Sequence, residues 1–143
     1  GIEQDAGNAI LNGVKDIWVP TDVYSVGQLK GARILIYGQS TSGMTATAPV
    51  NLQKSIMPVA WTRTYRIPGG KEGKAFATTM GAAIDFLCED LRRLLVNACF
   101  WAVGMGKQIP ENANVDFVNE YKPTMFGPEL FKKGGLPSKY EMK

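Results

Sequence analysis

The side chains that most often perform acid–base or nucleophilic chemistry are scarce in this chain. It contains no histidine and two cysteines, Cys88 and Cys99. Ser-His-Asp and Cys-His arrangements, and zinc sites with histidine ligands, are therefore excluded within the chain. We place both cysteines on one predicted helix, about 16 Å apart along its axis, which is too far for a disulfide. Both are expected to be small buried hydrophobic residues, with a reactive thiol as the alternative.

A predicted strand that ends at Gly81 and runs into a helix forms the first candidate binding site. Thr78, Thr79 and Asp85 lie at this junction. The first turn of a helix leaves backbone N–H groups free and carries the positive end of the helix dipole. Ligands of open α/β sheets often bind beside such junctions. The alternative interpretation is a plain tight turn with Asp85 as a helix cap.

Two further pairs combine an aromatic ring with a charged group. Trp61 and Arg63 lie two residues apart on a predicted strand and therefore share one face, which suits a sugar ligand. The alternative is one core tryptophan beside an arginine that extends to solvent. Asp22 and Tyr24 supply a carboxylate and a phenol near the start of the chain, and a surface turn is the alternative for this pair.

The hydrophobic pattern predicts the strands that must position these residues. Strands are predicted at 16–19, 23–26, 32–37, 57–66 and 74–80. The run Ala-Arg-Ile-Leu-Ile-Tyr at 32–37 is compact and mostly apolar, is bounded by Gly31 and Gly38, and indicates a buried strand. Residues 38–55 are rich in Gly, Ser, Thr and Ala and predict a long loop. Pro68-Gly69-Gly70 predicts the turn of an antiparallel hairpin.

Apolar residues at three- and four-residue steps after Gly81 predict one amphipathic helix. They are Ile84, Leu87, Leu91, Leu94, Leu95, Ala98 and Ala102. Glu89 and Arg93 form an i,i+4 pair, and Gly104 or Gly106 supplies the C-terminal stop. The helix is expected to pack on the sheet through its leucine face.

Length and composition describe one domain with a hydrophobic core. The chain has 143 residues, of which 45% are hydrophobic and 20% charged, and its net charge is +3. This charge is too small and dispersed for nucleic-acid binding, and the pair Arg92-Arg93 is expected to be solvated surface. No apolar run reaches the about 18 residues of a membrane span; the richest, 94–103, is broken by Asn97.

The chain changes character after Gly106. Prolines and glycines in residues 107–143 prevent long regular elements, while aromatic residues persist. We therefore divide the chain into an α/β domain at 1–106 and an extended tail at 107–143. Aromatic residues along such a tail are expected to dock, on the domain itself, on a partner subunit or on another part of the protein.

Several segments together resemble the C-terminal half of trehalose-utilisation (ThuA-like) domains, in order and spacing, across residues 8–104. They are Ile-Leu-Asn-Gly-Val at 10–14, Pro-Thr-Asp-Val-Tyr at 20–24, Pro-Val-Ala-Trp-Thr-Arg-Thr-Tyr at 58–65, Gly-Lys-Ala-Phe-Ala-Thr-Thr-Met-Gly at 73–81 and Leu-Arg-Arg-Leu-Leu-Val-Asn-Ala-Cys-Phe-Trp-Ala at 91–102. Val-Asp-Phe-Val at 115–118 and Glu-Tyr-Lys-Pro at 120–123 are similar to the tail of a bacterial branch of that family.

The resemblance implies a flavodoxin-like α/β fold related to class I glutamine amidotransferases and a link to sugar metabolism. It predicts a partial mixed sheet with one long C-terminal helix and an extended tail. The family is usually longer, and the missing first half holds the junction where amidotransferases place their nucleophile. Family histidines are replaced here by residues near Asn8 and at Ala82, so any site that used them is lost.

The resemblance carries over a set of pocket-lining candidates, with no metal and no cofactor. They are Asp22, Tyr24, Trp61, Arg63, Thr79 and Gly81. We expect a domain that binds a carbohydrate or similar polar small molecule, without catalytic machinery of its own and without a nucleic-acid or membrane partner. The alternative is an interaction module that forms a homo-oligomer through an unpaired sheet edge and the tail. A complete hydrolase or amidotransferase would depend on Cys88 or Cys99.

Overall fold

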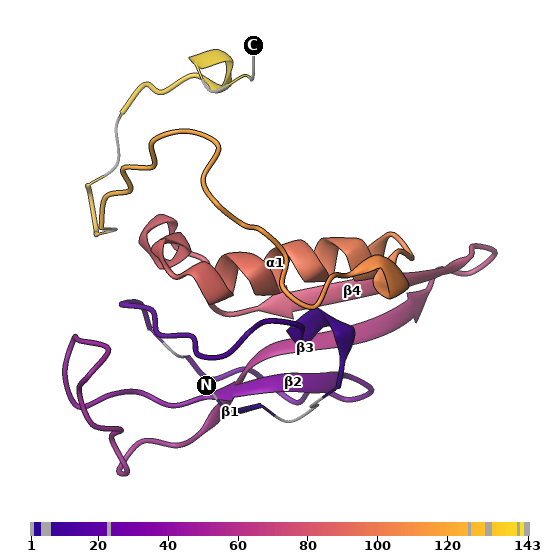
Figure 1. Cartoon of the computed structure of the whole chain (residues 1–143), viewed down its shortest axis with the longest axis horizontal. Coiled ribbons are helices and arrows are strands. Elements are labelled where there is room, and N and C mark those ends of the chain that lie inside the picture. The colour runs from indigo at the N-terminus through magenta and orange to yellow at the C-terminus, as the bar shows by residue number, and fades with distance from the viewer. Residues whose placement is uncertain are drawn as a thin grey trace.

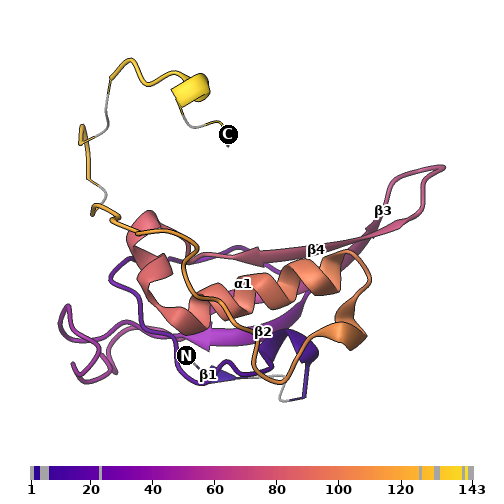
Figure 2. The ribbon, with the colours of Figure 1, turned by 45° about the horizontal axis from the view of Figure 1, so that its top comes forward.

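The chain forms a small antiparallel sheet with one α-helix along one of its faces (Figures 1 and 2). The computed structural model describes residues 2–3, 7–22, 24–125, 127–130, 133–139 and 141. The sheet order is β1–β2–β3–β4. The elements are β1 (Ile2–Glu3), β2 (Arg33–Gly38), β3 (Met57–Arg66), β4 (Glu72–Thr78) and α1 (Glu89–Ala102). The mixed α/β character expected from the sequence is therefore present.

The predicted hairpin is β3–β4, and its first strand has the predicted bounds. Gly70 N donates to Ile67 O at 2.8 Å, and Gly69 has a φ of 74°. Proline followed by a glycine with positive φ is the sequence of a type II turn. The returning strand starts at Glu72 and ends at Thr78, two residues earlier at each end than predicted.

Every strand pairing that the structure describes is antiparallel, which corrects the expected mixed sheet. Parallel neighbours need a crossover connection, usually a helix. The link between β2 and β3 is instead a long irregular loop with one isolated bridge, Thr41 to Val50. This loop matches the one predicted at 38–55.

The strand predicted at 16–19 is wrong, and residues 24–26 also form no strand; Val23 lies outside the described residues. The reason is visible at Asp16, whose backbone N–H donates to Asp90 Oδ2 at 2.9 Å. The neighbouring N–H of Lys15 donates to the same oxygen at 2.9 Å. The helix carboxylate thus takes the donors at the start of this segment, which runs irregularly into Pro20.

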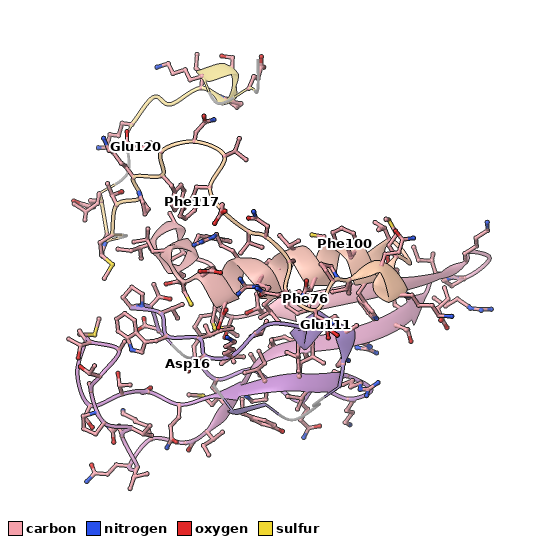
Figure 3. The ribbon with its side chains drawn as sticks, in the orientation of Figure 1. Asp16, Phe76, Phe100, Glu111, Phe117 and Glu120 are labelled. Carbon is pink, nitrogen blue, oxygen red and sulfur yellow. The ribbon has the colours of Figure 1, made fainter. Side chains whose placement is uncertain are left out.

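Helix α1 covers the sheet through the predicted leucine face. Leu91, Leu94 and Ala98 are buried in one cluster with sheet residues, and Phe76 packs against it, between α1 and the sheet in Figure 3. The long predicted helix is divided, because Cys88 has extended backbone angles. A separate 3₁₀-helix, η2 (Ala83–Leu87), precedes α1 and leaves Leu87 53% exposed.

Asn97, which interrupts the apolar run of the sequence, is a buried anchor. Its Nδ2 donates to Ile10 O at 3.0 Å and to Asn12 O at 2.9 Å. These bonds hold the 3₁₀-helix η1 (Ala9–Leu11) against α1. The helix ends where predicted, with Gly104 at a φ of 84°, a conformation that favours glycine.

Cys99 is exposed and Cys88 half-buried, and both are free thiols. The expectation that both are buried is therefore wrong. Cys99 lies one residue after the buried Ala98, and one residue turns a helix by about 100°. Its side chain therefore leaves the face that packs on the sheet.

Arg92 and Arg93 fasten the tail to α1, so the expectation of solvated surface is wrong. Arg93 is only 4% exposed; it pairs with Glu89, as predicted, and with Asp90. Its Nε donates to Ala113 O at 3.2 Å, and Arg92 Nε donates to Val115 O at 2.8 Å.

The first part of the tail consequently docks on the domain itself. Ile109, Ala113 and Val115 are buried, whereas residues 133–139 lie away from the sheet and helix in both views (Figures 1 and 2). Among the described residues, no helix combines the length and apolarity that a membrane crossing requires.

Candidate functional site

Two adjoining pockets lie between residues 17–22 with Tyr24 on one side and the C-terminal ends of β2 and β4 on the other. Each has a volume of about 410 Å³, within the about 300–1,000 Å³ of small-molecule sites. The Trp18 pocket is lined by Ile17, Trp18, Val19, Pro20, Thr21, Asp22, Ile36, Gly38, Gln39, Ser40, Thr41, Ser42, Gly43, Met44, Val59 and Met80. The Gly81 pocket is lined by Thr21, Asp22, Tyr24, Thr78, Thr79, Met80, Gly81 and Ala82.

The sheet topology explains why these residues meet. β2 and β4 both run antiparallel to β3, so their C-terminal ends lie at the same end of the sheet. Ile17 and Val19 pack against the core and draw the segment 17–22 across that end. Thr21, Asp22 and Met80 line both pockets and mark where they adjoin.

Asp85 joins the two sides of the site from behind. Its side chain is fully buried, and Oδ2 accepts hydrogen bonds from Gly81 N at 3.0 Å and Ala82 N at 3.0 Å. The same oxygen accepts a third bond, 2.6 Å long, from Thr21 Oγ1. Asp85 is therefore the cap that the sequence offered as an alternative, and it also ties the loop to the strand–helix turn.

Four of the six predicted site residues come together. Asp22, Tyr24, Thr79 and Gly81 all line the Gly81 pocket, and Asp22 also reaches the Trp18 pocket. Tyr24 is 54% exposed at its rim. The Thr79 hydroxyl oxygen is buried and has no hydrogen-bond partner among the described residues.

Trp61 and Arg63 lie elsewhere. Their neighbour Thr62 is buried opposite Phe76, on the face that packs against α1. Because side chains alternate along a strand, Trp61 and Arg63 share the other face, as predicted. They line neither pocket, and Arg63 is exposed.

Trp18 and Thr21 are the site residues that the sequence reasoning did not select. Both precede Asp22 in the run Trp-Val-Pro-Thr-Asp at 18–22. An aromatic ring, a proline and two polar side chains in five residues are a signal of a shaped loop, whereas the sequence reasoning places a strand at 16–19 and only a turn at 20–22. The loop after β2 also supplies hydroxyl groups, from Ser40 to Ser42.

Charge at the site is confined to one side chain. Asp22 is the sole charged residue among the described residues that line the pockets. Within the same described part of the chain, no group of three or more His, Cys, Asp or Glu side chains could hold a metal ion. Neither cysteine lines either of these two pockets, so a reactive thiol would act away from this site.

No family model matches the chain, and neither the curated proteins nor the solved structures yield a match. Fold and site together define a small protein of mixed α/β character, with an antiparallel sheet, one covering helix and a polar double pocket at the end of the sheet.

Proposed function

We propose that this chain is a ThuA-like domain that binds a carbohydrate or similar polar small molecule across the Trp18 and Gly81 pockets. The order and spacing of the segments quoted above support the family, and with it the flavodoxin-like fold that the family implies. The observation that carries the binding role is that Trp18 and the hydroxyl-bearing residues Ser40, Thr41 and Ser42 line one pocket.

The chemistry of that pocket suits a sugar. The faces of a sugar ring carry C–H groups that pack on an aromatic ring, and Trp18 supplies a large apolar surface. Sugar hydroxyl groups both donate and accept hydrogen bonds, and a few well-placed polar groups fix a ligand's orientation. Asp22 and Thr21 supply such groups where the pockets adjoin.

The proposal is one of binding without catalysis by this chain. Glycoside hydrolysis ordinarily needs two carboxyl groups that flank the bond. Asp22 is the one carboxyl group among the described lining residues, while Asp85 lies behind the wall with its Oδ2 engaged by three donors.

The decisive test compares two tryptophans. Glucose, maltose and trehalose are titrated against the intact chain by calorimetry and thermal unfolding. A ligand at a free concentration of 100 times its Kd stabilises a protein by about 2.7 kcal/mol. We expect Trp18→Ala to lose the stabilisation by these sugars and Trp61→Ala to keep it. Unchanged sugar binding by Trp18→Ala, or no binding by any of the three sugars, contradicts the proposal.

A second candidate function is assembly of a homo-oligomer through the sheet. β4 is the last strand in the sheet order, and the face opposite α1 carries Trp61. Unpaired edges readily pair with another chain. The tail is a weaker contributor than expected, because residues 109–115 are bound to α1 of the same chain. Light scattering across a concentration series tests assembly: a constant mass of 15.6 kDa rejects it.

A further inference from the structure

At the strand–helix turn around Gly81, the backbone N–H groups of residues 79–82 all donate hydrogen bonds within the protein. Gly81 N and Ala82 N donate to Asp85 Oδ2. Met80 N donates to Thr78 Oγ1 at 3.1 Å, and Thr79 N donates to Val59 O at 3.0 Å. Phosphate sites at such turns depend on free N–H groups. The four consecutive donors at residues 79–82 are therefore closed to a phosphate.

The side chains that line the two pockets also disfavour an anionic ligand. Asp22 is the one charged group among the described lining residues, and it stands where the pockets adjoin. A carboxylate accepts hydrogen bonds and donates none. A like charge brought beside it is repelled, and a hydroxyl or ammonium group is attracted.

Two hydroxyl groups of lining residues already donate their protons to acceptors within the protein. Thr21 Oγ1 donates to Asp85 Oδ2 at 2.6 Å, and Thr41 Oγ1 donates to Gly43 O at 2.6 Å. A hydroxyl has one proton and two lone pairs, so each of these oxygens can only accept from a ligand. Asp85 therefore sets the hydrogen-bond direction of Thr21.

From these observations we infer that the double pocket selects an unphosphorylated polyhydroxylated ligand, uncharged or cationic, whose hydroxyl or amino groups donate to Thr21 Oγ1 and the Asp22 carboxylate. This inference rests on the proposed function and adds the ligand's charge and hydrogen-bond direction. Thr21 is then the residue that determines specificity, and Asp85 is its positioning residue.

Matched sugar pairs test the inference on the intact chain. Glucose is compared with glucose 6-phosphate, trehalose with trehalose 6-phosphate, and glucose with glucosamine, by calorimetry at low salt. We expect each phosphorylated sugar to bind at least about tenfold more weakly than its neutral partner, and glucosamine to bind no more weakly than glucose. Equal or tighter binding of the phosphorylated sugars overturns the inference and leaves the proposed function intact. Binding by no member of any pair overturns both.

Variants of Asp22 and Thr21 test whether these two acceptors cause the expected selection against phosphorylated sugars. Asp22→Asn keeps the shape of the side chain and removes its charge, so the discrimination against phosphate should narrow to within about threefold. Thr21→Val removes the acceptor and should weaken neutral sugars at least about tenfold, whereas Thr21→Ser should retain binding within about threefold. Full discrimination in Asp22→Asn, or unchanged sugar affinity in Thr21→Val, overturns the assignment. Urea unfolding of each variant confirms that the comparison is made on folded protein.

Discussion

In two regions of the chain a tryptophan is followed within four residues by a charged side chain, and only one of these two regions lines a pocket. Trp18 and Asp22 belong to an irregular segment that crosses the end of the sheet, and both line pockets. Trp61 and Arg63 belong to β3, on the face away from α1, and line neither pocket. Strand spacing guarantees a shared face, but a concave site needs a second segment to build its opposite wall.

What builds that wall is a buried carboxylate distant in sequence. Asp85 binds the hydroxyl of Thr21, 64 residues earlier, and two N–H groups of the turn before η2. The pocket end of the sheet therefore depends on a polar network, whereas the Trp61 face depends on the pairing of β3 with β2 and β4. The same kind of substitution should have different effects in the two regions.

The largest difference is expected for removal of a charged side chain. Asp85→Ala leaves three hydrogen-bond donors without their acceptor, each worth about 1–3 kcal/mol when buried and unpaired. We expect a loss of at least about 3 kcal/mol in the free energy of unfolding, together with loss of sugar binding. Arg63→Ala on the exposed face should change stability by less than about 0.5 kcal/mol. Both values are measured by urea unfolding.

The variant Asp85→Asn distinguishes the contribution of the hydrogen bonds to Asp85 from that of its negative charge. The amide keeps one oxygen that can accept from the turn, so its loss of stability should be clearly smaller than that of Asp85→Ala. If Asp85→Ala and Arg63→Ala unfold at the same urea concentration, the pocket end does not depend on Asp85, and the contrast between the two regions disappears.

A smaller difference is expected when a glycine in each region is changed to alanine. Gly81 has a φ of 149°, and no atom lies within 4 Å of an added Cβ. Gly73 has crowded surroundings, with the Tyr65 ring 2.4 Å from an added Cβ, but it has no positive φ. Backbone strain costs about 1–3 kcal/mol, whereas the exposed Tyr65 side chain can swing aside.

We therefore expect Gly81→Ala to destabilise by about 1–3 kcal/mol. Gly73→Ala should be nearly neutral, because alanine loses less conformational entropy than glycine in a strand. Thermal unfolding of the two variants shows which substitution lowers the stability more. A more severe effect at Gly73 would mean that crowding by Tyr65 outweighs backbone strain at Gly81.

The elements with local patterns could be predicted from the sequence. The β3–β4 hairpin and the leucine face of α1 follow from alternation, a Pro-Gly turn and helical spacing. The pocket could be predicted only in part: Asp22, Tyr24, Thr79 and Gly81 line it as expected, but the bond from Thr21 to Asp85 that joins its two sides was not predicted. No local pattern pairs Thr21 with Asp85, or tells that Trp18 faces a pocket.

The misjudged arginines have the same origin. Arg92-Arg93 looks like a solvated pair in sequence, yet its partners include carbonyl groups of a tail some twenty residues later, at Ala113 and Val115. Proline and glycine in the tail argued correctly against regular structure. They could not show that a chain without strands or long helices is nevertheless packed, since its backbone is held by side chains of α1.

The smallest difference is expected for a single hydroxyl group. Tyr121 Oη donates to Ala83 O at 2.6 Å, beside the wall of the Gly81 pocket, and its ring stacks on Phe117 with centroids 4.8 Å apart. Tyr121→Phe keeps the stacking and removes the bond, so a loss of about 0.5–1 kcal/mol is expected at this exposed position. Tyr65→Phe, on the exposed part of β3, should leave stability unchanged. Urea unfolding of both variants measures the difference, and equal stability would show that the tail adds nothing to the pocket end through this contact.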